Sequence, residues 1–270
     1  MDLSISRRGF LAAVPAAAIV SGCVPGAMVL DGNWGRFATD TTRLVDHAAW
    51  DTFLKDYLVK SDDGVNRVRY TAAASADPLM LKPYLASLEN VDLAGLGKDE
   101  QMAFWINLYN AATVDLILQK PTIRSIRDLG PLTLGPWDKK VATVAGTRLS
   151  LNNIEHGILR PIWQDVRIHY AVNCASIGCP NLAQRAYTAA DLETMLEQAA
   201  RDYINHPRGF AMVNGGLTAS SIYNWYASDW GTQADILDHA RRYARGETGT
   251  LLDGATQIDR FDYDWALNAA

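Results

Sequence analysis

Two neighbouring segments of the sequence concentrate side chains that could bind or react. They carry carboxylate, imidazole, guanidinium and thiol groups at Glu155, His156, Arg160, His169, Cys174 and Cys179. Buried polar groups need hydrogen-bond partners, and groups this close in sequence most easily find them in one another. We therefore expect these residues to converge on one polar cavity, with Cys174 and His156 as candidate catalytic residues and the other four as candidate binding residues.

Cys174 is the candidate nucleophile. Residues 167–173 are expected to form a strand, so that Cys174 would lie at its end, before small residues that could open a helical turn. A thiol at a helix N-terminus beside an imidazole has a lowered pKa and reacts as a thiolate at neutral pH. His156 is the preferred base, because His169 would point to the opposite face of the strand. The arrangement is analogous to that of papain-like and transglutaminase-like enzymes.

The cysteines also fit other roles. In an oxidising compartment, Cys174 and Cys179 could form a disulfide that closes a small loop and stabilises the fold by about 2 kcal/mol. Together with His156 and His169 they could ligate zinc, but the spacing of the two histidines does not fit the usual pattern. We therefore expect no metal and no cofactor, and leave a structural disulfide and a reactive thiol as alternatives.

The longest expected helix, residues 98–118, is apolar nearly all round and should be buried at the centre of the domain. Asn107 and Asn110 share one of its faces. Their amides need partners, since an unsatisfied buried amide costs about 1 to 3 kcal/mol. Both are counted among the binding residues. Glu155 cannot easily orient His156, because neighbouring side chains on a helix point about 100° apart. Asn107, Asn110 or Asp115 could do so instead.

The remaining pattern predicts helices grouped before and after a few hairpin-linked strands. Helices are expected over residues 42–59, 78–88, 150–160, 188–205 and 232–246, a strand over 65–70, and hairpins over 137–149 and 210–218. In the helix expected over residues 150–160, Ser150 or Asn152 should be the N-cap, and Pro161 should end the helix. This order indicates an α+β fold in which helices flank a small, mostly antiparallel sheet.

Aromatic residues gather near Asp229 in the last third of the chain. They are Tyr223, Trp225, Tyr226 and Trp230. Their helical spacing fits either core packing or the lining of a groove for a glycan or a peptide. The histidines outside the two polar segments are expected at the surface.

The first 23 residues have the order of an export signal. Arg7 and Arg8 lie in Ser-Arg-Arg-Gly-Phe-Leu, which resembles a twin-arginine signal, and an apolar run leads to Val-Ser-Gly-Cys, which resembles a lipobox ending at Cys23. The run is about half the roughly 20 residues that a membrane span needs. We therefore expect a lipoprotein anchored through Cys23, with residues 24–40 as a tether and 41–270 as a single globular domain.

The charge and the residues after the signal indicate which partners and which membrane the protein has. The net charge is −5, and no cluster of lysine or arginine follows the signal, which argues against nucleic acid. Val24, rather than aspartate, stands two positions into the mature chain, counting Cys23 as the first. By resemblance to proteobacterial lipoproteins this favours the outer membrane over the inner. A periplasm-facing position is expected.

Several short segments of the sequence resemble those of a known family. They are Phe-Trp-Ile-Asn-Leu-Tyr-Asn at 104–110, Ile-Glu-His at 154–156, Leu-Arg at 159–160, the cysteine segment 174–180 and Tyr-Asp-Trp at 263–265. Together they are similar to the family catalogued as domain of unknown function 547, over residues 95–265. The resemblance implies a shared fold and shared polar positions, and it carries no established activity.

Two functions follow as expectations. The first is a cofactor-free, thiol-dependent amide hydrolase or acyl transferase, in which Cys174 attacks a carbonyl and His156 moves the proton. Its substrates would be peptides or cell-envelope compounds. The second is a non-catalytic binding module of the cell envelope, stabilised by a disulfide, that holds a peptide, a glycan or an envelope protein. The distance between the two sulfurs distinguishes them.

Overall fold

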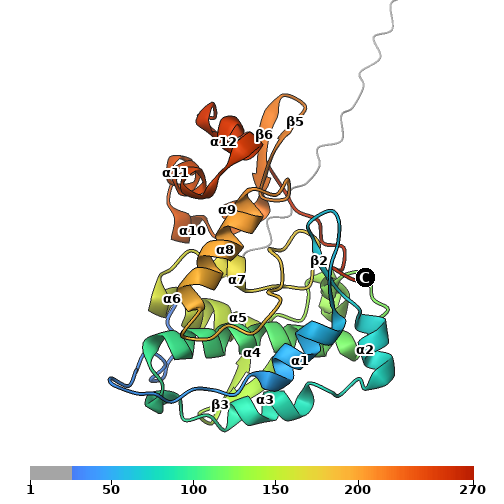
Figure 1. The fold of residues 1–270 in the computed structure, drawn as a ribbon, viewed down its shortest axis with the longest axis vertical. Coiled ribbons are helices and arrows are strands. Elements are labelled where there is room, and N and C mark those ends of the chain that lie inside the picture. The colour runs from blue at the N-terminus through green and yellow to red at the C-terminus, as the bar shows by residue number, and fades with distance from the viewer. Residues whose placement is uncertain (1–25) are drawn as a thin grey trace, which may run out of the picture.

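The computed structural model describes residues 26–270, so the expected signal, with Arg7, Arg8 and Cys23, lies outside the described residues. The described chain is a mixture of helices and small sheets (Figure 1), which confirms the α+β class. Within this part of the chain, no helix is long and apolar enough to cross a membrane.

Helices dominate the fold, and the strands are short. The helices are α1 (Ala48–Tyr57), α2 (Tyr70–Ala76), α3 (Lys82–Glu89), α4 (Lys98–Leu118), α5 (Leu151–Ile154), α6 (Arg160–Trp163), α7 (Ile168–Ala171), α8 (Leu192–Ile204), α9 (Ser221–Trp225), α10 (Ala227–Trp230), α11 (Gln233–Tyr243) and α12 (Gly246–Asp253). The strands are β1 (Leu58–Lys60), β2 (Asn66–Val68), β3 (Lys140–Val144), β4 (Thr147–Ser150), β5 (Phe210–Val213), β6 (Gly216–Ser220) and β7 (Arg260–Asp262).

The strands form separate small sheets rather than the single sheet that was expected. β1 pairs with β2 and β3 with β4, both antiparallel, while β7 joins the β5–β6 hairpin in parallel with β6. Both predicted hairpins are confirmed. They turn at Ala145-Gly146 and Asn214-Gly215, where all four residues have positive φ, as tight hairpin turns require.

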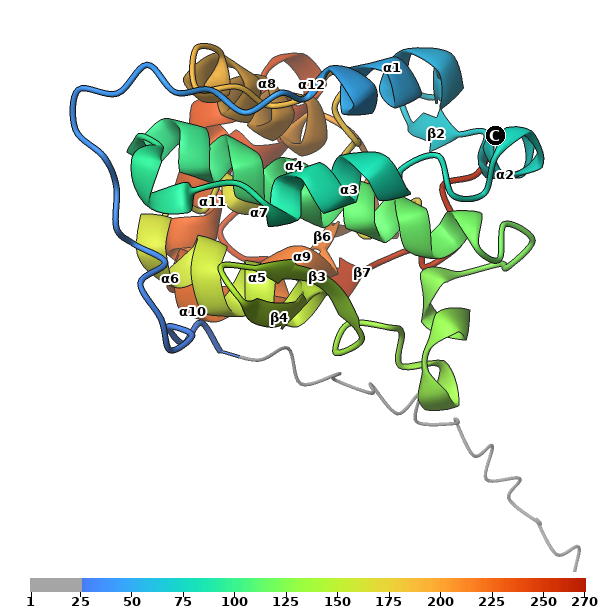
Figure 2. The same cartoon turned by 90° about the horizontal axis from the view of Figure 1, so that it is seen from below.

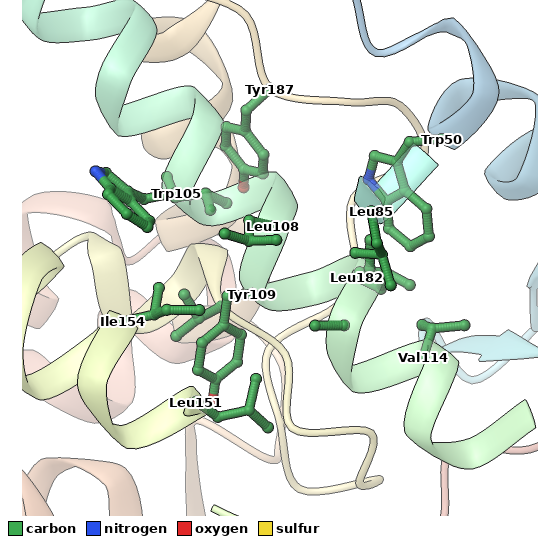
Figure 3. Packing of buried hydrophobic residues seen from close by; sticks show 14 of the residues in the cluster. Trp50, Leu85, Trp105, Leu108, Tyr109, Val114, Leu151, Ile154, Leu182 and Tyr187 are labelled. Carbon is green, nitrogen blue, oxygen red and sulfur yellow. The ribbon is translucent and has the colours of Figure 1, made fainter. Parts of the chain in front are cut away.

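Helix α4 forms the centre of the larger core, as its sequence predicts. It spans the predicted residues, and every side chain from Glu100 to Leu118 is buried. Figure 2 shows α4 between the layer of α1 and α8 and the layer of α5 with the β3–β4 hairpin. In Figure 3, Tyr109 points from α4 toward Leu151 and Ile154 of α5. The site residues carried by the α5 segment are therefore mounted directly on the core.

The C-terminal half builds a second hydrophobic cluster. Its buried residues come mainly from α8, from the β5–β7 sheet and from α9 to α12, which lie above α4 in Figure 1. Helix α7 joins the two clusters, because Ile168 packs in the first and Tyr170 in the second. The polar face of α7 consequently lies where the two halves meet.

The strand expected over residues 167–173 is wrong, because this segment contains helix α7. Asp165 accepts a hydrogen bond from the backbone N–H of Arg167 (2.9 Å) at the start of the turn. At its end, the side chain of Asn110 donates to the carbonyl of Ala171 (2.9 Å) and accepts from the N–H of Asn173 (2.8 Å). The nearby Asp165 and the distant Asn110 thus satisfy backbone groups at the two ends of this turn, which a neighbouring strand would otherwise have to pair.

Pro161 does not end its helix, contrary to expectation. Ser150 caps α5 through a capping box with Asn153, as predicted, but a π-helical turn, Glu155–Leu159, continues into α6. Proline lacks an N–H, and the wider π turn pairs the N–H of Arg160 with the carbonyl of Glu155. The N–H of Arg160 is therefore not used by the carbonyl of His156, and Pro161 has no N–H to donate to the carbonyl of Gly157.

Those two carbonyls bind the N-terminal segment of the described chain. The N–H of Met28 donates to His156 (3.0 Å) and that of Leu30 donates to Gly157 (2.8 Å). A β-carbon at Gly157 would lie 3.0 Å from the β-carbon of Leu30, so glycine permits this approach. Trp34 follows, buried edge-on against Trp105 at 5.7 Å between ring centroids. Residues 28–34, within the segment predicted to be a tether, thus contact the core.

Two histidines expected at the surface are buried. His47 lies against the hydroxyl of Tyr84 on α3 (2.7 Å), and His239 against that of Tyr170 (3.1 Å). A neutral imidazole that shares a hydrogen bond tolerates burial, which residue type alone does not reveal. His206, the third, is half-buried.

Candidate functional site

A cavity of about 590 Å³ lies where the two clusters meet. It brings together most of the predicted site residues: Glu155, His156, His169, Cys174 and Cys179 all line it. The wall is completed by loop 127–139 and by aromatic residues from α4, α9 and the C-terminal segment. Of the remaining predicted site residues, Arg160 lies behind His156, whereas Asn107 and Asn110 are not part of the wall.

Cys174 and Cys179 form a disulfide in the wall of this cavity. Cys174 is partly exposed, and Cys179 is 4% exposed. The polar groups around the sulfurs are hydroxyls and one backbone N–H: the hydroxyl of Tyr263 lies 3.0 Å from each sulfur, and that of Ser176 lies 3.2 Å from Cys174. No described imidazole hydrogen-bonds to either sulfur.

The loop between the cysteines is held from both ends. Asn173 accepts the N–H of Ala175 (2.8 Å) and donates to the carbonyl of Pro180 (2.7 Å), so one buried amide closes the loop. The N–H of Gly178 donates to the carbonyl of Asp264 (2.8 Å). A β-carbon at Gly178 would meet the backbone of Asp264 at 2.8 Å, so only glycine permits this approach.

His156 is oriented by Arg160 rather than by an asparagine or by Asp115. The guanidinium lies 3.0 Å from Nδ1 of the imidazole and can only donate, so Nδ1 accepts and the neutral ring carries its proton on Nε2. Burial, together with the positive charge of Arg160, lowers the pKa of His156, although Glu155 opposes the shift. At neutral pH this side chain offers the cavity an N–H donor.

Asp229 links Arg160 to His169. Its carboxylate accepts from Nε and Nη2 of Arg160 (2.6 and 2.9 Å) and from Nε2 of His169 (2.9 Å). Burial alone would raise the pKa of Asp229, but these hydrogen bonds hold it well below its usual value. The His169 ring stacks on Tyr226 with 4.0 Å between centroids, and the guanidinium of Arg160 lies 4.9 Å from the centre of the same ring. One carboxylate therefore fixes both Arg160, which lies behind His156, and His169, which lies in the cavity wall.

Glu155 is a buried carboxylate of the cavity wall, which also contains Asp138. Burial raises the pKa of its carboxyl, but the charges of His156 and His169 and a hydrogen bond from Tyr226 outweigh burial and lower it. Its Oε1 has no hydrogen-bond partner among the described residues, and it lies 3.9 Å from Nδ1 of His156. The site thus combines a carboxylate acceptor with the imidazole donor beside it.

Asn107 and Asn110 position the polar segments instead of lining the cavity. Asn107 exchanges two hydrogen bonds with the backbone of Tyr187 (2.8 and 2.9 Å). Asn110 binds the backbone on either side of Val172, which places the cysteine loop over α4. Both amides have the partners that the sequence requires, and those partners are peptide groups.

The aromatic group near Asp229 divides between wall and core. Trp225 and Tyr226 line the cavity, whereas Tyr223 and Trp230 are buried in the second cluster. Trp225 stacks on Trp265 at 5.3 Å between centroids, and Tyr263 lies within 5 Å of both rings. This aromatic wall is adjacent to the disulfide.

Sequence reasoning assigned no site role to several residues that build the site. Asp229 is remote in sequence from Arg160 and His169, and Tyr263 is remote from the cysteines, so no local spacing connects them. For Tyr263, the sequence offered one indication, because the tripeptide Tyr-Asp-Trp at 263–265 is among the segments that resemble the family. Within residues 26–270, no group of three or more His, Cys, Asp and Glu side chains could hold a metal ion.

Fold and site define an α+β domain with an aromatic-walled, polar-ended cavity beside a disulfide. Residues 93–204 match the family described as "Protein of unknown function, DUF547". The match supports the domain family that the sequence resembles, and it contains Glu155, His156 and both cysteines. Asp229 and Tyr263 lie outside it. Comparison with curated proteins and with solved structures gave no match.

Proposed function

We propose that this protein is a non-catalytic ligand-binding module of the cell envelope. The observation that carries the proposal is the cavity of about 590 Å³, whose lining combines several aromatic side chains with Glu155 and His156. Small-molecule sites are concave and mostly apolar, with a few placed polar groups that fix orientation. This cavity has both parts.

The disulfide favours binding over the thiol-dependent hydrolase. While Cys174 is bridged to Cys179, neither sulfur is a free nucleophile. A catalytic thiol also needs a base beside it, usually an imidazole. The polar side chains beside Cys174 are instead those of Ser176 and Tyr263. The bridge further fits an oxidising compartment such as the periplasm.

The chemistry of the wall defines the ligand class. Trp225 and Trp265 offer flat apolar faces, Glu155 accepts hydrogen bonds, and His156 donates one. The ligand would combine an apolar or ring-shaped face with a hydrogen-bond-donating end, as peptides and glycans of the cell envelope do. Its donor would take the unpartnered Oε1 of Glu155.

Tryptophan fluorescence tests the proposal directly, because Trp225 and Trp265 line the cavity. Titration with cell-wall peptides and with glycan fragments should give a saturable change. His156→Ala and Trp225→Ala should weaken binding at least about tenfold. Trp163→Ala, a half-buried tryptophan away from the cavity, is the matched control. Equal affinity in all of these variants would refute the proposed site, and catalytic turnover of a bound peptide would favour the hydrolase.

The proposed location rests on the sequence alone. The module would be exported by the twin-arginine route and held through lipid on Cys23, facing the periplasm, on the outer rather than the inner membrane. Mass spectrometry of protein from the native host should find lipidated Cys23 as the first residue, and Cys23→Ala should abolish membrane attachment. Residues 1–22 still present in the mature protein would contradict this location.

A further inference from the structure

The two sulfurs of the disulfide have different surroundings. Cys174 is partly exposed in the cavity, so a solute that enters the cavity reaches it first. Cys179 is buried, and its sulfur accepts a hydrogen bond from the backbone N–H of Cys174 (3.0 Å). The hydroxyl of Tyr263 lies 3.0 Å from both sulfurs, so it can also donate to Cys179. Donors of this kind stabilise a thiolate more than a neutral sulfur.

Tyr263 is built to remain a donor. Burial raises the pKa of its hydroxyl well above the usual value of 10, so the proton stays on the oxygen. The hydroxyl of Ser176 lies 2.8 Å from that oxygen and can donate to it. The resulting chain of hydroxyls strengthens the bond from Tyr263 to the sulfur of Cys179.

We propose that the pair is a thiol–disulfide exchange site in which Cys174 is the sulfur attacked by an incoming thiol and Cys179 is the sulfur that leaves. Exchange is fastest when the attacked sulfur is accessible and the leaving thiolate is stabilised. The exposure of Cys174 supplies the first condition, and the backbone N–H that bonds to Cys179, with Tyr263 within reach of both sulfurs, supplies the second. This activity goes beyond ligand binding and does not depend on it.

The reaction balances with a dithiol as the reductant. One thiol loses its proton to solvent, and its sulfur forms a bond to Sγ of Cys174 as the bond from Cys174 to Cys179 breaks. The electron pair of the broken bond stays on Cys179 as a thiolate. The second thiol of the dithiol also loses its proton to solvent and attacks the first sulfur of the dithiol. The bond from that sulfur to Cys174 breaks, and Cys174 leaves as a thiolate. Two electrons pass from the dithiol to the protein, and the reverse sequence oxidises a dithiol.

The cavity wall favours a thiol with apolar neighbours. Tyr263, Trp225 and Trp265 pack together next to the disulfide, with ring centroids 4.6 to 5.3 Å apart. A cysteine side chain flanked by apolar residues in a peptide can stack there, whereas glutathione would depend on Arg127 and Lys139, which also line the cavity, to bind its carboxylates. The peptide and glutathione both attack through a cysteine thiol, so their relative rates of exchange with the disulfide show which of them the cavity prefers.

Pulse alkylation of the wild-type domain tests which sulfur is reactive. The chain is prepared with Cys23→Ala, so that Cys174 and Cys179 are its only cysteines. After reduction by dithiothreitol under native conditions, a short iodoacetamide pulse should label Cys174 at least about tenfold more than Cys179, because reaction follows exposure as well as thiolate character. Equal labelling, or a disulfide that dithiothreitol reduces only after unfolding, would overturn the proposal.

Single-cysteine variants test the order of attack in the opposite redox direction. Oxidised glutathione, or the disulfide of an apolar cysteinyl peptide, should form a stable mixed disulfide with Cys179→Ser through Cys174. Cys174→Ser should form it at least about tenfold more slowly. Circular dichroism confirms that each variant is folded. A faster reaction at Cys179 would contradict the assignment, and a faster reaction with glutathione than with the peptide would contradict the apolar preference.

Tyr263→Phe tests the leaving-group role separately. Loss of one hydrogen bond to a developing thiolate should slow native reduction by dithiothreitol about tenfold. Tyr243→Phe is the matched control, since its hydroxyl bonds to Glu197 and not to a sulfur. Equal rates for the two variants would refute the role of Tyr263. An unreactive disulfide in a protein that still binds its ligand would overturn exchange alone, and the binding proposal would stand.

Discussion

Side chains in and near the cavity differ in how much they contribute to the stability of the fold. Trp105 and His156 illustrate the division. Trp105 is completely buried between Phe104 and Trp34. His156 lines the cavity and contributes a hydrogen-bond acceptor to Arg160, which also binds Asp229.

Truncation of these two residues should have unequal effects on stability. Trp105→Ala removes a buried ring and should lower the free energy of unfolding by about 3 to 5 kcal/mol. His156→Ala should cost less, about 1 to 2 kcal/mol, mainly for the hydrogen bond that Arg160 loses. Thermal or denaturant unfolding of both variants decides the matter. A histidine variant as unstable as the tryptophan variant would make His156 part of the core.

The docking of elements depends on side chains that their own local sequence does not reveal. The π-helical turn, Glu155–Leu159, exposes two carbonyls, and residues 28–30 bind them. Helix α3 likewise meets the start of α1 through Tyr84 and His47. In both cases a polar contact joins segments that hydrophobic periodicity alone does not bring together.

Trp34→Ala tests whether residues 28–34 belong to the core. Trp34 is buried against Trp105, so its truncation should lower the free energy of unfolding by about 3 kcal/mol or more. Phe37→Ala, at a half-buried aromatic a few residues later, should cost clearly less. Denaturant unfolding measures both. Similar small losses would mean that the segment is not bound to the domain in solution.

His47 should make stability depend on pH. Burial lowers the pKa of His47 to about 4, although Asp51 and Asp46 partly oppose the shift, whereas its unfolded value is 6.5. Because the folded pKa is the lower one, the stabilisation is complete above pH 6.5 and is lost as pH falls toward 4. The loss should approach 3 kcal/mol at pH 4.

His47→Gln should flatten this dependence. Denaturant unfolding at pH 7.5 gives the cost of the substitution itself, because the wild-type imidazole is neutral there. Repeating the measurement down to pH 4 should show a smaller decline in the variant than in the wild type. Parallel pH profiles would show that His47 ionises in the folded state as readily as in the unfolded state.

Across the whole molecule, segments late in the chain complete structures that begin early. Leu267 donates to the carbonyl of Arg124 (2.7 Å), Asn268 accepts from the hydroxyl of Tyr70 (2.8 Å), and Ala269 pairs with Val68. Trp265 closes the cavity wall. Residues 264–270 therefore join the N-terminal half to the cysteine loop.

Removal of residues 264–270 should lower the free energy of unfolding by about 5 kcal/mol or more. Buried Leu267 and Asn268 and their hydrogen bonds are lost together, against the 5 to 15 kcal/mol typical of a domain. Removal of residues 269–270 alone, which are exposed, is the control and should cost much less. Calorimetry of the two shortened chains compares them. Equal melting temperatures would contradict a structural role for the segment.

The sequence predicts best where the signal is local. Helix α4 has the predicted bounds because its apolar run is long, and the hairpins are correct because Ala-Gly and Asn-Gly-Gly mark their turns. Helix α7 was predicted as a strand because four residues are too few for periodicity to decide, and Asn110 determines their conformation from a distance. The cavity residues were found by their chemistry, whereas Asp229 and Tyr263 reach the site only through tertiary folding.

The position of Tyr263 and Trp265 has a consequence for biosynthesis. A nascent chain that has emerged only as far as α12 already contains both cysteines, His156 and Glu155, but it lacks the Tyr263 and Trp265 rings of the aromatic wall and the hydroxyl that contacts the sulfurs. The cavity therefore exists only after these residues have left the ribosome. A translocation route that transports folded proteins, as proposed here, would deliver the finished cavity to its compartment, while a product arrested before residue 263 would have no binding site to deliver.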